Sequence, residues 1–428
     1  MKIMTAEDFY QEINNQSLTD HTETELDQAV LEIIQTVRKE RDQALLNYTE
    51  QFDAVVLDNL TVTEKEFKEA KAAVSDDVLT ALQKAINNIR EFHEAQKEKS
   101  WMLMQKKGVM LGQIVTPIER VGVYVPGGKA GYPSTVLMAV IPAQIAGVEE
   151  IVITTPPGKD GKVNPYVLAA AELLGITKIY KVGGAQAIAA LTYGTETIKR
   201  VDKIVGPGNA YVARAKKWVF GDVGIDMIAG PSEICVVADD HANPAYVAAD
   251  LLSQAEHDES ANAICVTTNE GLAKEIQSQV NAQTETLERK QIIQASIKDN
   301  GRIVVAKDVD EAIEIANLLA PEHLELMVEN PMDILPLVKH AGAIFLGSYS
   351  PEPLGDYFAG PNHTLPTNGT ARFASPLGVY DFIKRSSLIS YPKAAFDETA
   401  NEIITLANIE GLTAHANSIQ IRKDNRDA

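Results

Sequence analysis

The first hundred residues carry hydrophobic positions at helical spacing. Between Glu23 and Asn47, apolar residues return every three or four positions among charged ones, which is the pattern of one buried helix face. The segment Thr63–Glu66 has the capping-box sequence of a helix start, and Ser75 caps a further helix that runs towards His93. We therefore predict an N-terminal helical region over residues 1–105 and assign it no chemistry.

The hydrophobic pattern changes at Val109. From there to about Gly347, short runs of Val and Ile alternate with helix-like segments, which is typical of a parallel sheet with crossover helices. The order of these segments occurs twice, as four pairs of strand segments: residues 151–155 and 264–268, 178–182 and 302–306, 201–205 and 324–328, and 225–232 and 343–348. The pattern predicts an α/β protein with two similar Rossmann-like parallel-sheet domains, related by internal duplication.

This organisation divides the chain into four regions. After the helical region, residues 106–232 form the first Rossmann-like domain, residues 233–378 form the second, and residues 379–428 form a helical tail. Ligands of such sheets usually bind beyond the carboxyl ends of the strands. We therefore expect the chemistry to lie in the segments that connect the predicted strands and helices.

Composition narrows the classes of function. The 39 Lys and Arg against 59 Asp and Glu give a formal net charge of −20, which argues against a nucleic-acid partner because phosphate binding needs a basic surface. The most apolar stretch, Ser134–Val148, is interrupted by Pro142 and is shorter than the roughly 20 residues of a membrane span. The start of the chain lacks the apolar core of a signal peptide, and two cysteines exclude a disulfide framework. These features predict a cytoplasmic enzyme with no membrane or nucleic-acid partner.

Three glycine-rich turns follow predicted strands of the first domain. They are Tyr124–Gly128, Val182–Gln186 and Val205–Asn209. Glycine in such a turn lets backbone N–H groups approach an anion at a helix N-terminus. The chain has neither a Walker-type P-loop nor a clean Gly-x-Gly-x-x-Gly motif, so each turn could also be an ordinary tight turn. Together the turns indicate a nucleotide site with Tyr124, Gln186 and Asn209 at its mouth.

Residues typical of a divalent-metal site occur in three other segments. Gln254 and His257 are three positions apart on a predicted helix, so they share one face. Asp356 lies in a Gly- and Pro-rich segment that ends at His363, and His415 lies in the tail. Imidazole, amide and carboxylate ligands without thiolates favour a catalytic zinc or similar ion. Sequence spacing leaves open whether these residues converge, and whether His415 reaches the site of another subunit.

An acid and an imidazole adjoin at Glu322 and His323, between a predicted helix and a predicted strand. Both could reach one ligand from a turn, although the pair could also be a charged helix end. Cys235 is a candidate nucleophile, because a cysteine thiolate is reactive. Its Val- and Ile-rich surroundings contain no basic residue that would stabilise a thiolate. We therefore exclude Cys235 as the nucleophile.

Taken together, these motifs resemble the histidinol dehydrogenase family over nearly the whole chain. The matching segments are the three glycine-rich turns and residues 228–233, 250–257, 321–323, 355–363 and 412–415. The resemblance implies an NAD-dependent oxidoreductase for the last two steps of histidine biosynthesis. It would convert L-histidinol and two NAD⁺ to L-histidine and two NADH through an enzyme-held histidinaldehyde.

The resemblance also implies a role for each matching residue. The family's ligands to one Zn²⁺ per subunit fall on Gln254, His257, Asp356 and His415. Its NAD contacts fall on Tyr124, Gln186 and Asn209. Its substrate contacts fall on Ser232, Gln254, His257, His323, Asp356, Glu410 and His415, with His363 as a further one. Zinc would orient the substrate, His323 would act as general base and Glu322 would activate water. The family is homodimeric, so Glu410 and His415 would complete the partner subunit's site.

Two alternatives use the same residues. A zinc hydrolase would use the four ligands with Glu322 as base, but it would leave the glycine-rich turns unexplained. A non-catalytic nucleotide- or metabolite-binding protein could retain the fold, but it would have no need for the acid–base and ligand positions. NADH formation from histidinol distinguishes the dehydrogenase from both.

Overall fold

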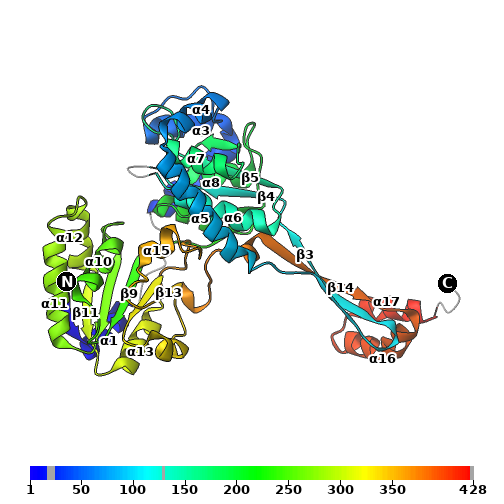
Figure 1. The fold of residues 1–428 in the computed structure, drawn as a ribbon. Coiled ribbons are helices and arrows are strands. Elements are labelled where there is room, and N and C mark those ends of the chain that lie inside the picture. The colour runs from blue at the N-terminus through cyan, green and yellow to red at the C-terminus, as the bar shows by residue number, and fades with distance from the viewer. Residues whose placement is uncertain (17–24, 128–130, 425–428) are drawn as a thin grey trace. The chain divides into compact units, whose positions relative to one another are not determined.

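The computed structural model describes residues 1–16, 25–127 and 131–424. Glu23 and Gly128, which belong to segments predicted above, lie outside the described residues. The chain forms two compact units (Figure 1). The larger comprises Met1–Gln96 and Ile118–Phe382, and the smaller comprises Lys97–Pro117 and Ile383–Ala428.

The larger unit contains a five-stranded parallel sheet with strand order β6-β5-β4-β7-β8. Its strands are β4 (Arg120–Tyr124), β5 (Glu150–Thr155), β6 (Ile179–Lys181), β7 (Lys203–Val205) and β8 (Gly224–Ile225). The associated helices are α6 (Pro133–Ala146), α7 (Pro165–Leu173), α8 (Gly184–Tyr193) and α9 (Ala210–Val219). Along β5, Ile151 and Ile153 enter one hydrophobic cluster and Val152 enters another. Both faces of this sheet are therefore buried, which explains the unbroken runs of Val and Ile.

A second parallel sheet in the same unit has the order β1-β11-β10-β9-β12-β13. Its strands after β1 are β9 (Glu233–Ala238), β10 (Asn262–Thr267), β11 (Arg302–Val305), β12 (His323–Met327) and β13 (Ala343–Leu346). The helices are α10 (Pro244–Ala255), α11 (Glu270–Thr284), α12 (Lys290–Asp299), α13 (Val309–Leu319), α14 (Pro331–Ile334) and α15 (Glu352–Tyr357). Counted from the first strand of each repeat, both sheets have the order 3-2-1-4-5. This shared topology confirms the predicted internal duplication.

The N-terminal region is mostly helical, as predicted, but it begins with a strand. Its helices are α1 (Ala6–Gln16), α2 (Glu25–Glu40), α3 (Asp42–Asp53), α4 (Glu64–Ala73) and α5 (Asp76–Glu94). The capping box at Thr63 is present. The first strand, β1 (Lys2–Thr5), pairs in parallel with β11 in the second sheet. The sequence analysis missed it because four residues are too short for a distinct period, and the partner strand lies about 300 positions away.

The smaller unit contains an antiparallel sheet of β14 (Ile383–Ser390), β3 (Met110–Pro117) and β2 (Trp101–Met104). Helices α16 (Lys393–Ile409) and α17 (Thr413–Asp424) complete it. Both helices confirm a helical tail, but β14 was not expected there. Its sequence is rich in Lys, Arg and Ser and mostly exposed, so no apolar alternation marks it as a strand. Short 3₁₀ turns cover Lys106–Gly108 in this unit and Leu335–Leu337, Thr370–Arg372 and Val379–Phe382 in the larger one.

Within the described parts of the chain, none of the helices has the length and apolar character that crossing a membrane requires.

Candidate functional site

The acid–base pair predicted from the sequence lies at the amino end of β12. Glu322 immediately precedes the strand and His323 is its first residue. Glu322 Oε2 accepts a hydrogen bond from the Glu233 backbone N–H at 2.9 Å, and His323 Nδ1 lies 2.9 Å from the Glu233 carbonyl oxygen. The first residue of the neighbouring strand β9 therefore holds both members of the pair. Both side chains are buried.

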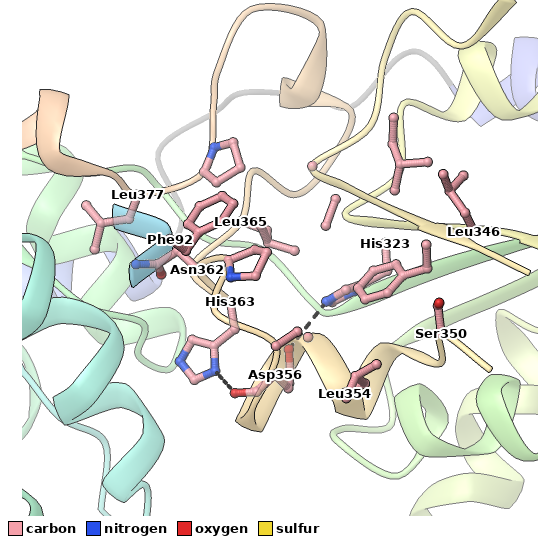
Figure 2. A pocket seen from close by; sticks show the side chains of 18 of the residues that line it. Phe92, His323, Leu346, Ser350, Leu354, Asp356, Asn362, His363, Leu365 and Leu377 are labelled. Atoms are coloured by element: carbon pink, nitrogen blue, oxygen red, sulfur yellow. Dashed lines mark hydrogen bonds and ion pairs between the residues drawn. The ribbon is translucent and has the colours of Figure 1, made fainter. Parts of the chain in front are cut away.

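The other ring nitrogen of His323 faces Asp356 (Figure 2). His323 Nε2 lies 3.7 Å from Asp356 Oδ1 and has no hydrogen-bond partner among the residues that the structure describes. Burial disfavours the charged imidazole, but the carboxylates of Glu322 and Asp356 outweigh it and raise the pKa of His323 to about 10. Because Nδ1 is directed at a carbonyl oxygen, which can only accept, Nε2 is the atom that can exchange a proton.

Helix α15 supplies both Asp356 and a further carboxylate, that of Glu352. His323, Glu352 and Asp356 each offer one ligand atom, and these atoms lie within 4.8 Å of one another. Burial raises the pKa of Asp356, but the adjacent His323 ring and the charge of His363 more than reverse this and lower the pKa to about 2. The sequence analysis did not identify Glu352. Its spacing of four from Asp356, which places both acids on one helix face, was the available signal.

Gln254 and His257 reach the same region from helix α10. Gln254 lies in the last turn of α10, and its carbonyl accepts a hydrogen bond from the His257 N–H just beyond the helix at 3.2 Å. The Gln254 side chain is 1% exposed, and its Oε1 is unpartnered within the described chain. Ser253 Oγ, one residue earlier, lies 3.2 Å from Glu352 Oε2. Burial lowers the pKa of His257, and the charge of Asp356 acts in the opposite direction, which indicates that the two groups are close.

A cavity of about 480 Å³ opens beside these residues, and His323, Asp356 and His363 belong to its lining (Figure 2). His363 Nδ1 lies 3.1 Å from the Asp356 carbonyl oxygen. Its neighbour Asn362 is buried and donates from Nδ2 to the Met138 carbonyl at 2.6 Å, which anchors the loop to α6. Ser232 adjoins Glu233 at the start of β9 and is not part of this lining.

Two further buried acids, Glu325 and Asp250, lie behind Glu352. The Glu352 N–H donates to Glu325 Oε1 at 2.8 Å, and the side chains of Glu325 and Asp250 interact. Burial, followed by the charge of Asp250, raises the pKa of Glu325 to about 9. Burial, followed by Asp356, raises that of Glu352 to about 8. At neutral pH these two side chains are therefore mainly protonated and can donate hydrogen bonds to their neighbours.

The residues predicted at the nucleotide site line a separate, larger cavity of about 1270 Å³. Tyr124, at the carboxyl end of β4, accepts a hydrogen bond at its hydroxyl from the Gly184 N–H at 3.1 Å. Gln186 is buried in the first turn of α8, and its Oε1 has no partner in the described part of the chain. Asn209 caps α9, its side chain accepting from the Val212 N–H at 3.2 Å. All three line the same cavity.

A buried ion pair holds the third glycine-rich turn in place. Lys216 and Asp226 form the pair, and both are almost fully buried. Lys216 Nζ donates to the Gly206 carbonyl at 3.0 Å, and the Gly206 N–H donates to Asp226 Oδ2 at 2.7 Å. Gly206 has a φ of +116°, and a Cβ there would lie 2.1 Å from the Tyr124 carbonyl oxygen. Only glycine therefore fits at this position, and its lack of a side chain lets the turn pack directly against β4.

The tail residues Glu410 and His415 lie in the smaller unit, where both are exposed. Glu410 caps the end of α16, and His415 is in the first turn of α17. Their predicted role in a partner subunit's site stays a prediction. Cys235 is fully buried in β9, and burial followed by the charge of Glu325 raises the pKa of its thiol to about 12. A thiol with this pKa stays protonated at neutral pH, which supports the exclusion of Cys235 as a nucleophile.

Comparisons with known proteins identify the family of this chain. The family model described as histidinol dehydrogenase matches residues 16–423. The histidinol dehydrogenase of Oceanobacillus iheyensis is 58% identical over 428 residues, covering 100% of both chains. That of Bacillus subtilis is 59% identical over 394 residues, covering 92% of each. The crystal structure of histidinol dehydrogenase from Elizabethkingia anophelis superimposes with a TM-score of 0.94 at 41% identity, covering 100% of this chain and 98% of that one. The chain therefore belongs to the histidinol dehydrogenase family and is an oxidoreductase.

Proposed function

We propose that this enzyme oxidises L-histidinol to L-histidine in two NAD-dependent steps, the last of histidine biosynthesis, in the cytoplasm. The overall reaction consumes one water and two NAD⁺ and releases two NADH and three protons. The observation that carries the proposal is the grouping of Glu322 and Asp356 around His323. His323 and Asp356 line one cavity, and His323 Nε2 and Gln254 Oε1 are unpartnered in the described chain. Two buried polar atoms without partners are costly unless a ligand pairs with them.

The residues fit a divalent metal. Asp356 supplies a carboxylate whose lowered pKa keeps it ionised, Gln254 supplies a free amide oxygen, and His257 supplies an imidazole. We assign these three as zinc ligands, with His415 of a second subunit as the fourth. Bound zinc would hold the amine and imidazole of histidinol and so orient its hydroxyl group. Glu352, which adjoins Asp356, would position it by a hydrogen bond from its protonated carboxyl.

His323 would act as the general base of the first oxidation. Its Nε2 would accept the hydroxyl proton while the carbon-bound hydride passes to the nicotinamide ring of NAD⁺, leaving histidinaldehyde. The carbonyl of Glu233 fixes the ring through Nδ1. His323 must be neutral for this role, and the neutral form is favoured once a cation offsets the negative charge of Asp356, which otherwise raises its pKa.

Glu322 would serve the second oxidation. Burial raises the pKa of its carboxyl to about 7, which is well placed for proton exchange at neutral pH. Glu322 would take a proton from water as that water adds to the aldehyde carbon. His323, protonated in the first step, would return its proton to the aldehyde oxygen to complete the gem-diol. The gem-diol would then lose a proton to His323 and a hydride to a second NAD⁺, and the carboxylic acid so formed would release its proton to give the carboxylate of histidine. Tyr124, Gln186 and Asn209 would contact the nucleotide in the larger cavity.

The smaller unit supports a homodimer with shared active sites. Its sheet and helices expose many large apolar side chains, namely Trp101, Met102, Leu103, Met104, Ile389, Leu406, Ile409, Leu412 and Ile421. Apolar side chains at this density usually mark a protein interface. Glu410 and His415 belong to this same unit, so dimer formation would carry them to the partner.

Subunit sharing can be tested by mixing two inactive variants. Co-refolded H323N and H415N should regain about a quarter of wild-type activity, because half of random dimers are mixed and each mixed dimer has one intact site. If His415 served its own subunit, both sites of each mixed dimer would be defective and the mixture would remain inactive. Light scattering of the unmixed protein should give twice the monomer mass.

The activity is tested with purified enzyme, Zn²⁺, L-histidinol and excess NAD⁺, followed at the NADH absorbance. Two NADH per histidinol, with histidine as product, would support the proposal. One NADH with accumulated aldehyde would contradict the second oxidation. A sample that forms no NADH would instead favour the hydrolase or the non-catalytic binding protein, and amide hydrolysis would separate those two.

A further inference from the structure

Asp53 presents an unsatisfied carboxylate oxygen to the nucleotide cavity. It is the last residue of α3 and contributes to the cavity lining together with Gln51 and Phe52. Its Oδ2 is buried and finds no hydrogen-bond partner in residues 1–16, 25–127 and 131–424. A buried carboxylate oxygen without a donor is costly, because water has been removed and nothing replaces it. Nothing in the chemistry described so far uses this group.

The surroundings of Asp53 fit a hydroxyl donor from a ligand. Asp53 and Tyr124 both line the cavity. Burial raises the pKa of Asp53. Burial, with a smaller contribution from the charge of Asp53, raises the pKa of Tyr124. The other buried unpartnered side-chain atom of the lining is Gln186 Oε1, also an acceptor. A ligand that satisfies both must bring hydrogen-bond donors, and ribose hydroxyl groups are such donors.

We infer that Asp53 accepts a hydrogen bond from a hydroxyl of the adenosine ribose of NAD and excludes the 2′-phosphate of NADP. This inference rests on the proposed function, which places NAD in this cavity. An acidic residue on the ribose is the general means by which dinucleotide-binding α/β domains select NAD. Here the acid comes from the N-terminal helices instead of the sheet.

The position of α3 identifies the adenosine end of the ligand. The nicotinamide ring must reach the His323 cavity, and no residue of α3 lines that cavity. In contrast, α3 supplies Tyr48, Gln51, Phe52 and Asp53 to the nucleotide cavity. The ring of Phe52 is 52% exposed and stacked on Tyr48 at 5.4 Å between centroids. The α3 end of the cavity therefore offers an open aromatic face for a base beside an acceptor for its ribose.

Charge at this end disfavours a phosphate. The last turn of a helix carries a partial negative charge, and here Asp53 adds to it. The other charged residues of the lining are Glu32, Lys159, Asp160 and Lys162. Lys162 donates a hydrogen bond to Glu69 at 2.7 Å, and this ion pair offsets the charge of Lys162. Among the described residues of the lining, Lys159 is then the one cation without an ion pair. A single exposed lysine is a weak counterpart to a dianionic phosphate.

The test compares Asp53→Asn with Glu32→Gln, which removes an exposed carboxylate of the same lining. Dissociation constants for NADH and NADPH are measured by titration calorimetry on the full-length enzyme, without turnover. Wild type should bind NADH at least about tenfold more tightly than NADPH. Asp53→Asn should weaken NADH binding about tenfold, the effect of losing one charged hydrogen bond, without weakening NADPH binding. Glu32→Gln should leave both constants within about twofold.

Three outcomes would overturn the inference. Asp53→Asn could leave both dissociation constants unchanged. It could instead weaken the binding of both nucleotides equally, which would place Asp53 against a part of the ligand that NADH and NADPH share. In either case, NADH formation from histidinol by wild type would leave the proposed function intact. Failure of wild type to bind either nucleotide would remove the proposed function as well. Thermal melting of each variant checks folding, and Asp53→Asn should melt no lower than wild type because it removes an unpartnered buried charge.

Discussion

The two duplicated sheets share one strand order but place their functional residues at opposite edges. In the first sheet, Tyr124 ends β4 and the glycine-rich turns follow β6 and β7, all at the carboxyl edge. In the second, Glu322 and His323 stand at the start of β12 beside the start of β9, at the amino edge. The candidate nucleotide residues of the first repeat therefore lie at the expected carboxyl edge, whereas the candidate acid–base pair lies at the opposite edge.

Helix direction gives a physical reason for this difference. At the carboxyl edge of a parallel sheet the helices begin, and their free N–H groups favour anions such as a pyrophosphate. At the amino edge the helices end, and their free carbonyl groups favour cations. Helix α10 ends at Ala255, between Gln254 and His257, which suits a metal ion. Each parallel sheet has two electrostatically opposite edges, and the candidate residues of the two repeats lie at different ones.

The largest expected effect comes from the acid–base pair at the amino edge. His323→Asn should lower the rate of the first oxidation at least about 100-fold, because general-base catalysis typically contributes that much. Glu322→Gln should impair oxidation of added histidinaldehyde more than oxidation of the alcohol. Single-turnover kinetics of each half-reaction measure this, and equal losses in both would refute the division of labour. Cys235→Ala is the matched control and should retain kcat within about twofold.

At the carboxyl edge, Asp226→Asn should destabilise the protein by about 3–5 kcal/mol, because it leaves Lys216 buried without a counter-charge. Denaturant unfolding measures this loss, and calorimetry should show weaker NADH binding as the Gly206 turn loosens. Adding Lys216→Met should recover part of the stability. A double variant no more stable than Asp226→Asn would show that the charge pair is not the cause.

The affinity for Zn²⁺, which we propose to bind at the amino edge, should depend on pH. The affinity for NADH at the carboxyl edge should not. Zn²⁺ must displace protons from imidazole ligands, so its affinity should fall about tenfold per ligand for each pH unit below the histidine range. Titration of chelator-treated enzyme between pH 5 and 8 measures this, and NADH affinity serves as the control. His257→Asn should reduce the steepness of the pH dependence. Equal zinc affinity at both pH values would argue against imidazole ligands.

The smallest effect concerns the buried acids Glu325 and Asp250, which lie behind the proposed metal ligands. The pKa of Glu325 is raised by burial and by Asp250 to about 9 in the folded protein, above its ordinary value of 4.5. The folded state therefore binds the proton more tightly, and stability falls as pH rises through this interval. Glu325→Gln keeps an acceptor for the Glu352 N–H and should gain stability relative to wild type as the pH rises from 5 to 8. A pH-independent difference in unfolding free energy would contradict the raised pKa.

Much of the fold could be predicted because its signals are local. Runs of Val and Ile at Ile151–Thr155 and its repeat predict strands that are buried on both faces. The capping box at Thr63 needs only four consecutive residues. In contrast, β1 and β14 pair with strands about 300 and 270 positions away, and neither has an apolar period of its own. Such pairing depends on the rest of the fold being in place.

The candidate site divides in the same way. Residue types and spacing named Gln186, Gln254, His323 and Asp356 as candidates, although each segment also had an ordinary structural interpretation, and the family resemblance gave each residue its role. Glu352 and Asp53 escaped notice, since their importance lies in buried oxygens beside groups from distant elements. The sequence by itself determined the two sheets and the chemical groups available to them. Only the tertiary structure decided which sheet edge each group occupies and which polar atoms lose water without gaining a partner, because burial is a property of the assembled chain.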